Sequence, residues 1–68
     1  MNEVFNERIK SLREDKGLSI QALARELKVS SASIFRWENS PTDIKSSQLI
    51  LLAKYFNVTT DYLLGLEN

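Results

Sequence analysis

The chain has 68 residues, the size of one small domain, and contains no cysteine and no histidine. That composition excludes a disulfide framework, a thiolate zinc site and histidine-based catalysis, so we expect a domain over residues 1–68 with no cofactor, no metal and no enzyme activity. Nine basic residues balance nine acidic ones, so the basic surplus typical of a nucleic-acid-binding protein is missing.

The first predicted helix covers about residues 3 to 15. Its apolar residues recur at three- and four-residue spacing, which favours a helix over a strand. Gly17 then stands where a glycine at the C-terminal end of a helix belongs. The apolar stripe consists of Phe5, Ile9 and Leu12.

A second and a third helix follow with a very short connection. Ser19 is a good N-cap for a helix with an apolar stripe of Ile20, Leu23, Ala24 and Leu27. Ser30 can cap the next helix, which we expect from Ser31 to about Glu38. A gap of about three residues forces the two helices to cross steeply, which is typical of a helix-turn-helix.

The third helix has two different sides when it is drawn at 3.6 residues per turn. One side carries Ser30, Ile34, Trp37 and Glu38. The other carries Ala32, Phe35, Arg36 and Asn39, with Ser31 beside them.

The rest of the chain predicts a loop and two more helices. The segment NSPTDIKS is a loop by its content of Pro, Asn, Asp and Ser. A fourth helix should run from Ser46 to Phe56, and Thr59 caps a last short helix that ends at Gly65. The predicted fold is therefore all-α, with five short helices around one core and a central helix-turn-helix.

The sequence resembles the Cro- and phage-repressor-type helix-turn-helix domains, often called the XRE family. The resemblance rests on RIKSLREDKGLS, ALARELKVSSASIFRWEN and LLAKYFNVTTDYLLG, which keep the spacing of that family across nearly the whole chain. It implies a lambda-repressor-like domain whose third helix lies in the major groove of double-stranded DNA. It also implies a homodimer, at least on DNA, that binds a palindromic operator.

Four positions depart from the family pattern. Ile20 stands where the family often has a glutamine that contacts a phosphate, although Gln21 is adjacent. Lys28 and Ser40 replace glycines before and after the third helix. The usual loop proline falls at Ile44, whereas this chain has a proline three residues earlier.

The resemblance assigns base contacts to Ser31, Ala32, Phe35 and Arg36. Arg36 can bind guanine O6 and N7 with two hydrogen bonds, or else it is a solvated side chain paired with a nearby acid. An aromatic side chain on a wet helix face is costly without a partner. Phe35 therefore either contacts a thymine methyl group or folds sideways onto the surface of the domain.

Two residues of the third helix have structural interpretations. Trp37 is on the inner side, so packing is favoured over stacking on a base. Glu38 is an acid close to a proposed polyanion. The resemblance pairs it with Arg13 of the first helix, in a partly buried ion pair that ties the two helices together.

Contacts with the DNA backbone are predicted for Gln21, Lys28, Ser30, Ser33, Asn39 and Lys45. Asn39 is the strongest candidate, because the family contacts the DNA backbone from this position at the end of the third helix. For each serine, capping of a helix is the simpler role. Few of these contacts are cationic, so dimerisation should supply much of the affinity.

The C-terminal end is the predicted dimer contact. The stretch YLLGLEN offers Leu64 and Leu66 beyond what a small core needs, although Leu66 could instead cover the fourth helix.

We therefore predict a sequence-specific transcriptional regulator, a repressor of phage or mobile-element type. A protein-interaction module with the same fold, such as an antitoxin or a partner of a regulator, is the alternative, favoured by the zero net charge, Ile20 and Phe35.

No run of about 18 apolar residues is present, and charges occupy the N-terminus where a signal peptide is apolar. These features predict a cytoplasmic protein with no membrane contact.

Overall fold

The computed structural model describes residues 3–41 and 44–67 of the chain. These residues form five helices: α1 (Glu3–Asp15), α2 (Ile20–Leu27), α3 (Ser31–Asn39), α4 (Ser46–Phe56) and α5 (Thr60–Leu64). This order of five helices, with no strand among the described residues, confirms the all-α prediction. The predicted loop over residues 39–46 includes Thr42 and Asp43, which lie outside the described residues.

The N-termini of three helices are fixed by the caps that the sequence predicts. The side chains of Ser19, Ser30 and Thr59 each accept a hydrogen bond from a backbone N–H in the first turn of α2, α3 and α5, at 3.0 to 3.1 Å. These bonds satisfy donors that the start of a helix would otherwise leave without a partner.

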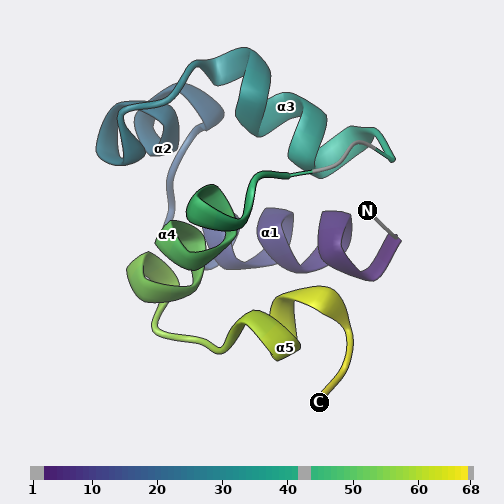
Figure 1. The fold of residues 1–68 in the computed structure, drawn as a ribbon. Coiled ribbons are helices and arrows are strands. Elements are labelled where there is room, and N and C mark those ends of the chain that lie inside the picture. Colours follow the sequence, from purple (N-terminus) through teal and green to yellow (C-terminus); the bar gives the residue numbers. More distant parts are fainter. Residues whose placement is uncertain (1–2, 42–43, 68) are drawn as a thin grey trace.

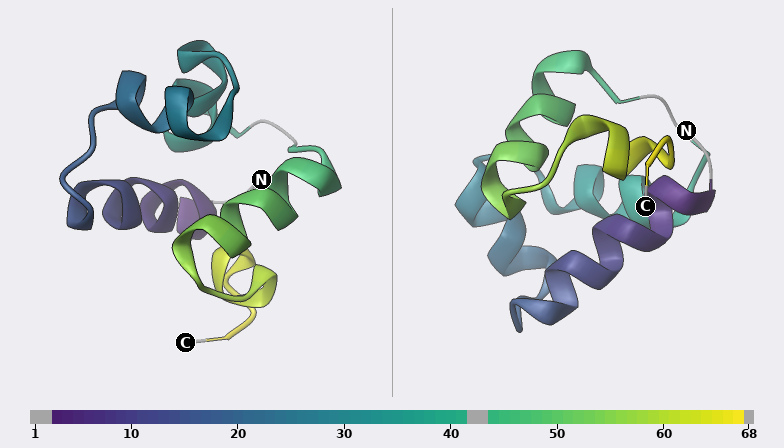
Figure 2. Two further views of the ribbon diagram at one scale, coloured as in Figure 1. Left: turned by 90° about the vertical axis from the view of Figure 1, so that its left-hand side faces the viewer. Right: turned by 90° about the horizontal axis from the view of Figure 1, so that it is seen from below.

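The core draws on every helix. α2 packs on α3, α1 packs on both α3 and α5, and α4 packs on α5. Figures 1 and 2 show α1 and α4 between the α2–α3 pair on one side and α5 on the other. The buried apolar residues are Phe5, Ile9, Leu23, Ala24, Leu27, Ile34, Trp37, Leu52, Ala53, Phe56 and Leu63.

Trp37 is 3% exposed, which confirms that it belongs to the core. Burial of side chains of this size is the main favourable contribution to folding in a chain without disulfides. None of the helices in residues 3–41 and 44–67 has the length and apolar character needed to span a bilayer.

The connection between α2 and α3 turns sharply at Lys28. This residue has φ 58 and ψ 42, in the left-handed region, and its N–H bonds back to carbonyls of α2. A residue with a Cβ atom is strained in this conformation, and glycine relieves that strain. The turn therefore has the geometry that a glycine would favour, although a lysine occupies it.

Candidate nucleic-acid interface

One face of α3 is exposed and the other is buried in the core. Ser31, Ala32, Phe35 and Arg36, the four predicted base-contacting residues, are all exposed, whereas Ile34, Trp37 and Glu38 are buried. Helical periodicity separates the two sets, because residues three and four apart share a face. Ser30 shares a side of the helical wheel with the buried residues, yet it is exposed, because it is the N-cap that precedes the first turn of α3.

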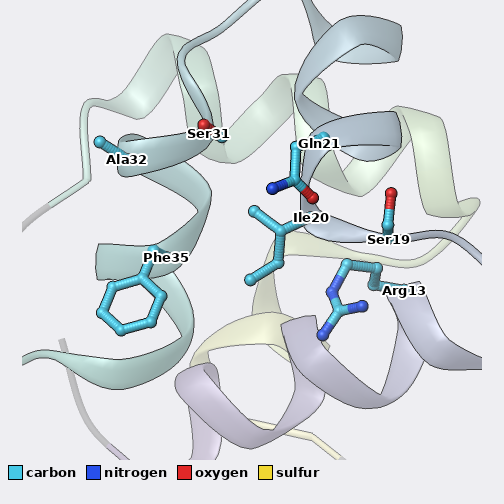
Figure 3. Close-up of a pocket in the computed structure, with 7 residues that line it drawn as sticks. All are labelled: Arg13, Ser19, Ile20, Gln21, Ser31, Ala32 and Phe35. Atoms are coloured by element: carbon cyan, nitrogen blue, oxygen red, sulfur yellow. The ribbon is translucent and has the colours of Figure 1, made fainter.

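An open groove of about 500 Å³ lies where α2 meets α3. Figure 3 shows Ile20 between Phe35 on one side and Arg13 on the other. The groove brings together four predicted DNA contacts, Gln21, Ser31, Ala32 and Phe35, and adds Arg13, Ser19 and Ile20. Arg36 lies outside the groove, and so do the predicted backbone contacts other than Gln21.

Phe35 remains 55% exposed although it lines this groove. The residue as a whole therefore keeps more than half of its surface open to solvent. This exposure is compatible with both interpretations of Phe35, because part of the residue is covered by the domain and the rest is accessible.

Arg36 is exposed and makes no ion pair within the residues that the structure describes. Its Nη2 donates one long hydrogen bond to Ser33 Oγ, at 3.4 Å. A guanidinium with most of its donors open to solvent can bind a base edge or a phosphate through two parallel hydrogen bonds.

The ion pair expected between α1 and α3 is present. Arg13 Nε lies 2.7 Å from Glu38 Oε2, and Arg13 Nη2 donates to Glu38 Oε1 at 3.0 Å. The side chains of Arg13 and Glu38 are 11% and 1% exposed. Arg13 Nη1 also donates to Leu18 O at 2.7 Å, so one guanidinium joins α1, α3 and the segment before α2.

The hydrogen bond with Glu38 raises the pKa of Arg13 above its usual value, whereas burial acts in the opposite direction. Arg13 therefore keeps its charge at physiological pH, and that charge offsets the acid on the inner side of α3. Glu38 consequently adds little repulsion toward a polyanion that approaches the outer side.

The six predicted contacts with the DNA backbone occupy different places. Gln21 and Ser33 lie within α2 and α3, Asn39 is the last residue of α3, and Lys28, Ser30 and Lys45 are helix caps. Ser30 Oγ caps Ser33 N at 3.1 Å and lies 2.9 Å from Ser33 Oγ. The capping role suggested for the serines thus applies to Ser30.

Asn39 uses part of its hydrogen-bonding capacity inside α3. Its Nδ2 donates to Phe35 O at 3.0 Å, while the side chain as a whole is exposed. An amide nitrogen carries two hydrogens, so a second donor and the oxygen stay available to a phosphate or to water.

The C-terminal segment exposes one leucine and half-buries another. Leu66 is 72% exposed and therefore does not cover α4, whereas Leu64 is half-buried. The segment is held by Arg8, which donates to Tyr62 O, donates to Glu67 O at 2.8 Å, and lies 4.1 Å above the Tyr62 ring. An exposed leucine on a fastened segment is well placed for contact with another molecule.

Two sets of contacts between distant parts of the chain were not predicted from the sequence. Asn6 of α1 binds carbonyls at the end of α3, and Arg8 holds the C-terminal segment. Neither position shows a local pattern that could have revealed its partner, because the contacts span 31 to 59 residues of chain.

Comparisons with known proteins agree with this architecture. A family model described as Helix-turn-helix matches residues 9–63. The HTH-type transcriptional activator BcrR of Enterococcus faecalis is 38% identical over 63 residues. That alignment covers 93% of this chain but only 31% of the activator, so the chain spans about a third of its length.

A solved structure has the same fold. The DNA-binding domain of the P22 C2 repressor superposes with a TM-score of 0.78 at 34% sequence identity. The match covers 94% of this chain and 86% of that domain.

Proposed function

Because the chain belongs to the helix-turn-helix family whose model matches residues 9–63, we propose that it binds double-stranded DNA in a sequence-specific manner and regulates transcription. The mechanism is occupancy of an operator, with no chemical step, at a site that blocks or assists RNA polymerase. The related activator and the similar repressor domain show that one fold serves both directions of regulation. Such a regulator would work in the cytoplasm.

The observation that carries the proposal is the two-sided construction of α3. Its inner side is fixed by the core and by the pair of Arg13 with Glu38, while small and polar side chains cover most of its outer side. A helix of this kind can approach the edges of bases closely, because serine and alanine occupy little space. Glu38, the acid on the inner side of the helix, is already paired with Arg13.

We assign direct base contacts to Ser31, Ala32, Phe35 and Arg36. Arg36 would bind a guanine through two hydrogen bonds, and the exposed part of the Phe35 ring would contact the methyl group of a thymine. Gln21, Lys28, Ser30, Ser33, Asn39 and Lys45 would contact the backbone and set the orientation of α3.

A two-fold dimer would place two α3 helices in successive major grooves, about 34 Å apart, on a palindromic operator. We place the dimer contact at Leu64 and Leu66. Exposure of Leu66 on a segment fastened by Arg8 supports this position. Dimerisation is needed for useful affinity, because the proposed interface of one monomer holds few cations.

In vitro selection on a random double-stranded DNA library tests the proposal. We expect recovery of a palindromic motif. Arg36→Ala should relax the motif at one base pair in each half-site and weaken operator binding by about 1–3 kcal/mol. Arg25→Ala is the matched control, because Arg25 is an exposed arginine on α2 that lies outside the proposed contacts. If no motif is enriched even at low salt, sequence-specific DNA binding by this chain is ruled out.

Binding to another protein is the second candidate function. It is favoured by the apolar part of the α2–α3 groove, where Ile20 and the largely exposed Phe35 lie together, and by the zero net charge. Salt dependence separates the two functions. Contacts with phosphates make affinity fall steeply as salt rises, whereas an apolar protein interface is much less sensitive.

A further inference from the structure

α3 ends in a different way from the other helices. α2, α4 and α5 end at Lys28, Asn57 and Gly65, which all have positive φ, and the glycine after α1 has φ 70. The residue that ends α3, Ser40, is extended, with φ −130 and ψ 149. Its N–H reaches only the carbonyl of Arg36, at 2.9 Å. Carbonyls of the last turn of a helix need donors from elsewhere when no left-handed cap is formed.

Asn6 of α1 supplies that donor. Its Nδ2 donates to Trp37 O at 2.5 Å and to Ser40 O at 3.2 Å. Both partners are carbonyl oxygens, which only accept hydrogen bonds, so the nitrogen of the amide must face them. A side chain from a helix more than 30 residues away thus takes the place of a local cap.

The same turn of α3 is held at a second point. Arg13 follows Asn6 by seven residues, which is two helical turns, so both side chains lie on one face of α1. Arg13 binds the carboxylate of Glu38, while Asn6 binds the carbonyls on either side of it in sequence, at Trp37 and Ser40. Asn6 and Arg13 of α1 therefore hold the last turn of α3. This turn contains Asn39 and begins directly after Arg36.

We propose that Asn6 is a positioning residue for DNA recognition, which sets the place of the last turn of α3 and through it the contacts of Arg36 and Asn39. The inference rests on the proposed function. Paired hydrogen bonds to a base are lost when the donor group moves by more than about 0.5 Å, so they depend on residues that lock the helix in place. Asn6 need not touch DNA to act in this way.

The test compares Asn6→Ala with Asn57→Ala. The second variant disturbs the left-handed residue at the end of α4, so it also lowers stability but leaves α3 untouched. Affinities for the selected operator and for unrelated DNA are measured at a temperature where both variants are fully folded. Amide hydrogen exchange at Asn39 and Ser40 reports directly on the end of α3.

We expect Asn6→Ala to lose about tenfold in operator affinity, the loss that one poor base contact causes, with little change for unrelated DNA. Exchange at the end of α3 should be faster in this variant than in Asn57→Ala. In an Arg36→Ala background the loss from Asn6→Ala should shrink, because the contact that it positions is gone.

Two results would overturn the inference. If Asn6→Ala binds the operator as tightly as the original chain once both are folded, Asn6 only stabilises the fold. If the original chain selects no operator, the proposed function fails and the role in DNA recognition fails with it. Hydrogen exchange would still reveal whether Asn6 fixes the end of α3, so the two failures are distinguishable.

Discussion

The two halves of the molecule differ in how they are held and in what they expose. Residues 3–40 are joined by polar contacts between helices, notably from Arg13 to Glu38 and from Asn6 to the end of α3. Residues 44–67 are also tied to α1 through Arg8, but they expose more aliphatic surface: Ile50 is 47% exposed, Leu51 39% and Leu66 72%, against 38% for Val4 in the first half. Polar ties between helices suit a surface that must keep its geometry beside a charged ligand. Exposed aliphatic residues suit contact with another protein surface.

The largest effect on the difference between the two halves is expected when the ion pair of Arg13 with Glu38 in the first half is removed. Glu38→Gln keeps the shape of the side chain but leaves the largely buried Arg13 without its counter-charge. We expect a loss of about 3 kcal/mol in the free energy of unfolding. In a domain of this size that loss lowers the melting temperature by roughly 10–20 °C.

Thermal unfolding followed by circular dichroism measures this change. Glu7→Gln is the control, because Glu7 is an exposed glutamate on α1. An unchanged melting temperature for Glu38→Gln would show that the pair contributes nothing to the tie between α1 and α3.

A smaller effect is expected in the second half. Leu66→Ser should raise the dissociation constant for an operator with two half-sites about tenfold, because coupling between the two copies is weakened. Binding to a single half-site should not change, and stability should stay within about 0.5 kcal/mol, because the side chain is already exposed.

Quantitative binding to the two DNAs provides the measurement, and Ile50→Ser provides the comparison. If Ile50→Ser causes the loss and Leu66→Ser does not, the contact between copies lies on α4 rather than at the C-terminal segment.

The smallest effect concerns the strained turn between α2 and α3. Lys28→Gly removes a left-handed lysine, so stability should rise by about 0.5–1 kcal/mol. If Lys28 contacts a phosphate, the same change should reduce the salt slope of DNA binding by about one for each monomer.

Asn57→Gly relieves the same backbone conformation at the end of α4 without loss of a cation, so it is the matched control. Equal salt slopes for the Lys28→Gly variant and the original chain would exclude Lys28 from the interface.

Local patterns were sufficient to predict the helices. Ser19, Ser30 and Thr59 cap the helices that their positions indicate, and α3 extends only one residue beyond the predicted end, to Asn39. Capping depends on side chains within three residues of each other, which a single sequence displays directly. The partner of Glu38 was predicted from the family resemblance, since no spacing rule connects it to α1.

Contacts between distant helices could not be predicted from the residues. The hydrogen bonds of Asn6 and the position of Arg8 above Tyr62 depend on how the helices are placed after packing. An asparagine in a helix and an exposed-looking arginine carry no pattern that identifies a partner 31 or 54 residues away. The left-handed conformation of Lys28 was likewise visible only as a departure from a family glycine.

The division of α3 into a buried side and an exposed side has an evolutionary consequence. The residues at the four proposed base-contacting positions are exposed, whereas Ile34, Trp37 and Glu38 are the buried residues of α3. Substitutions at exposed positions usually change stability by less than about 0.5 kcal/mol. If these four residues read the operator as proposed, mutation at their positions would explore new operator sequences while the scaffold stays folded, and the DNA target of the domain would evolve independently of its structure.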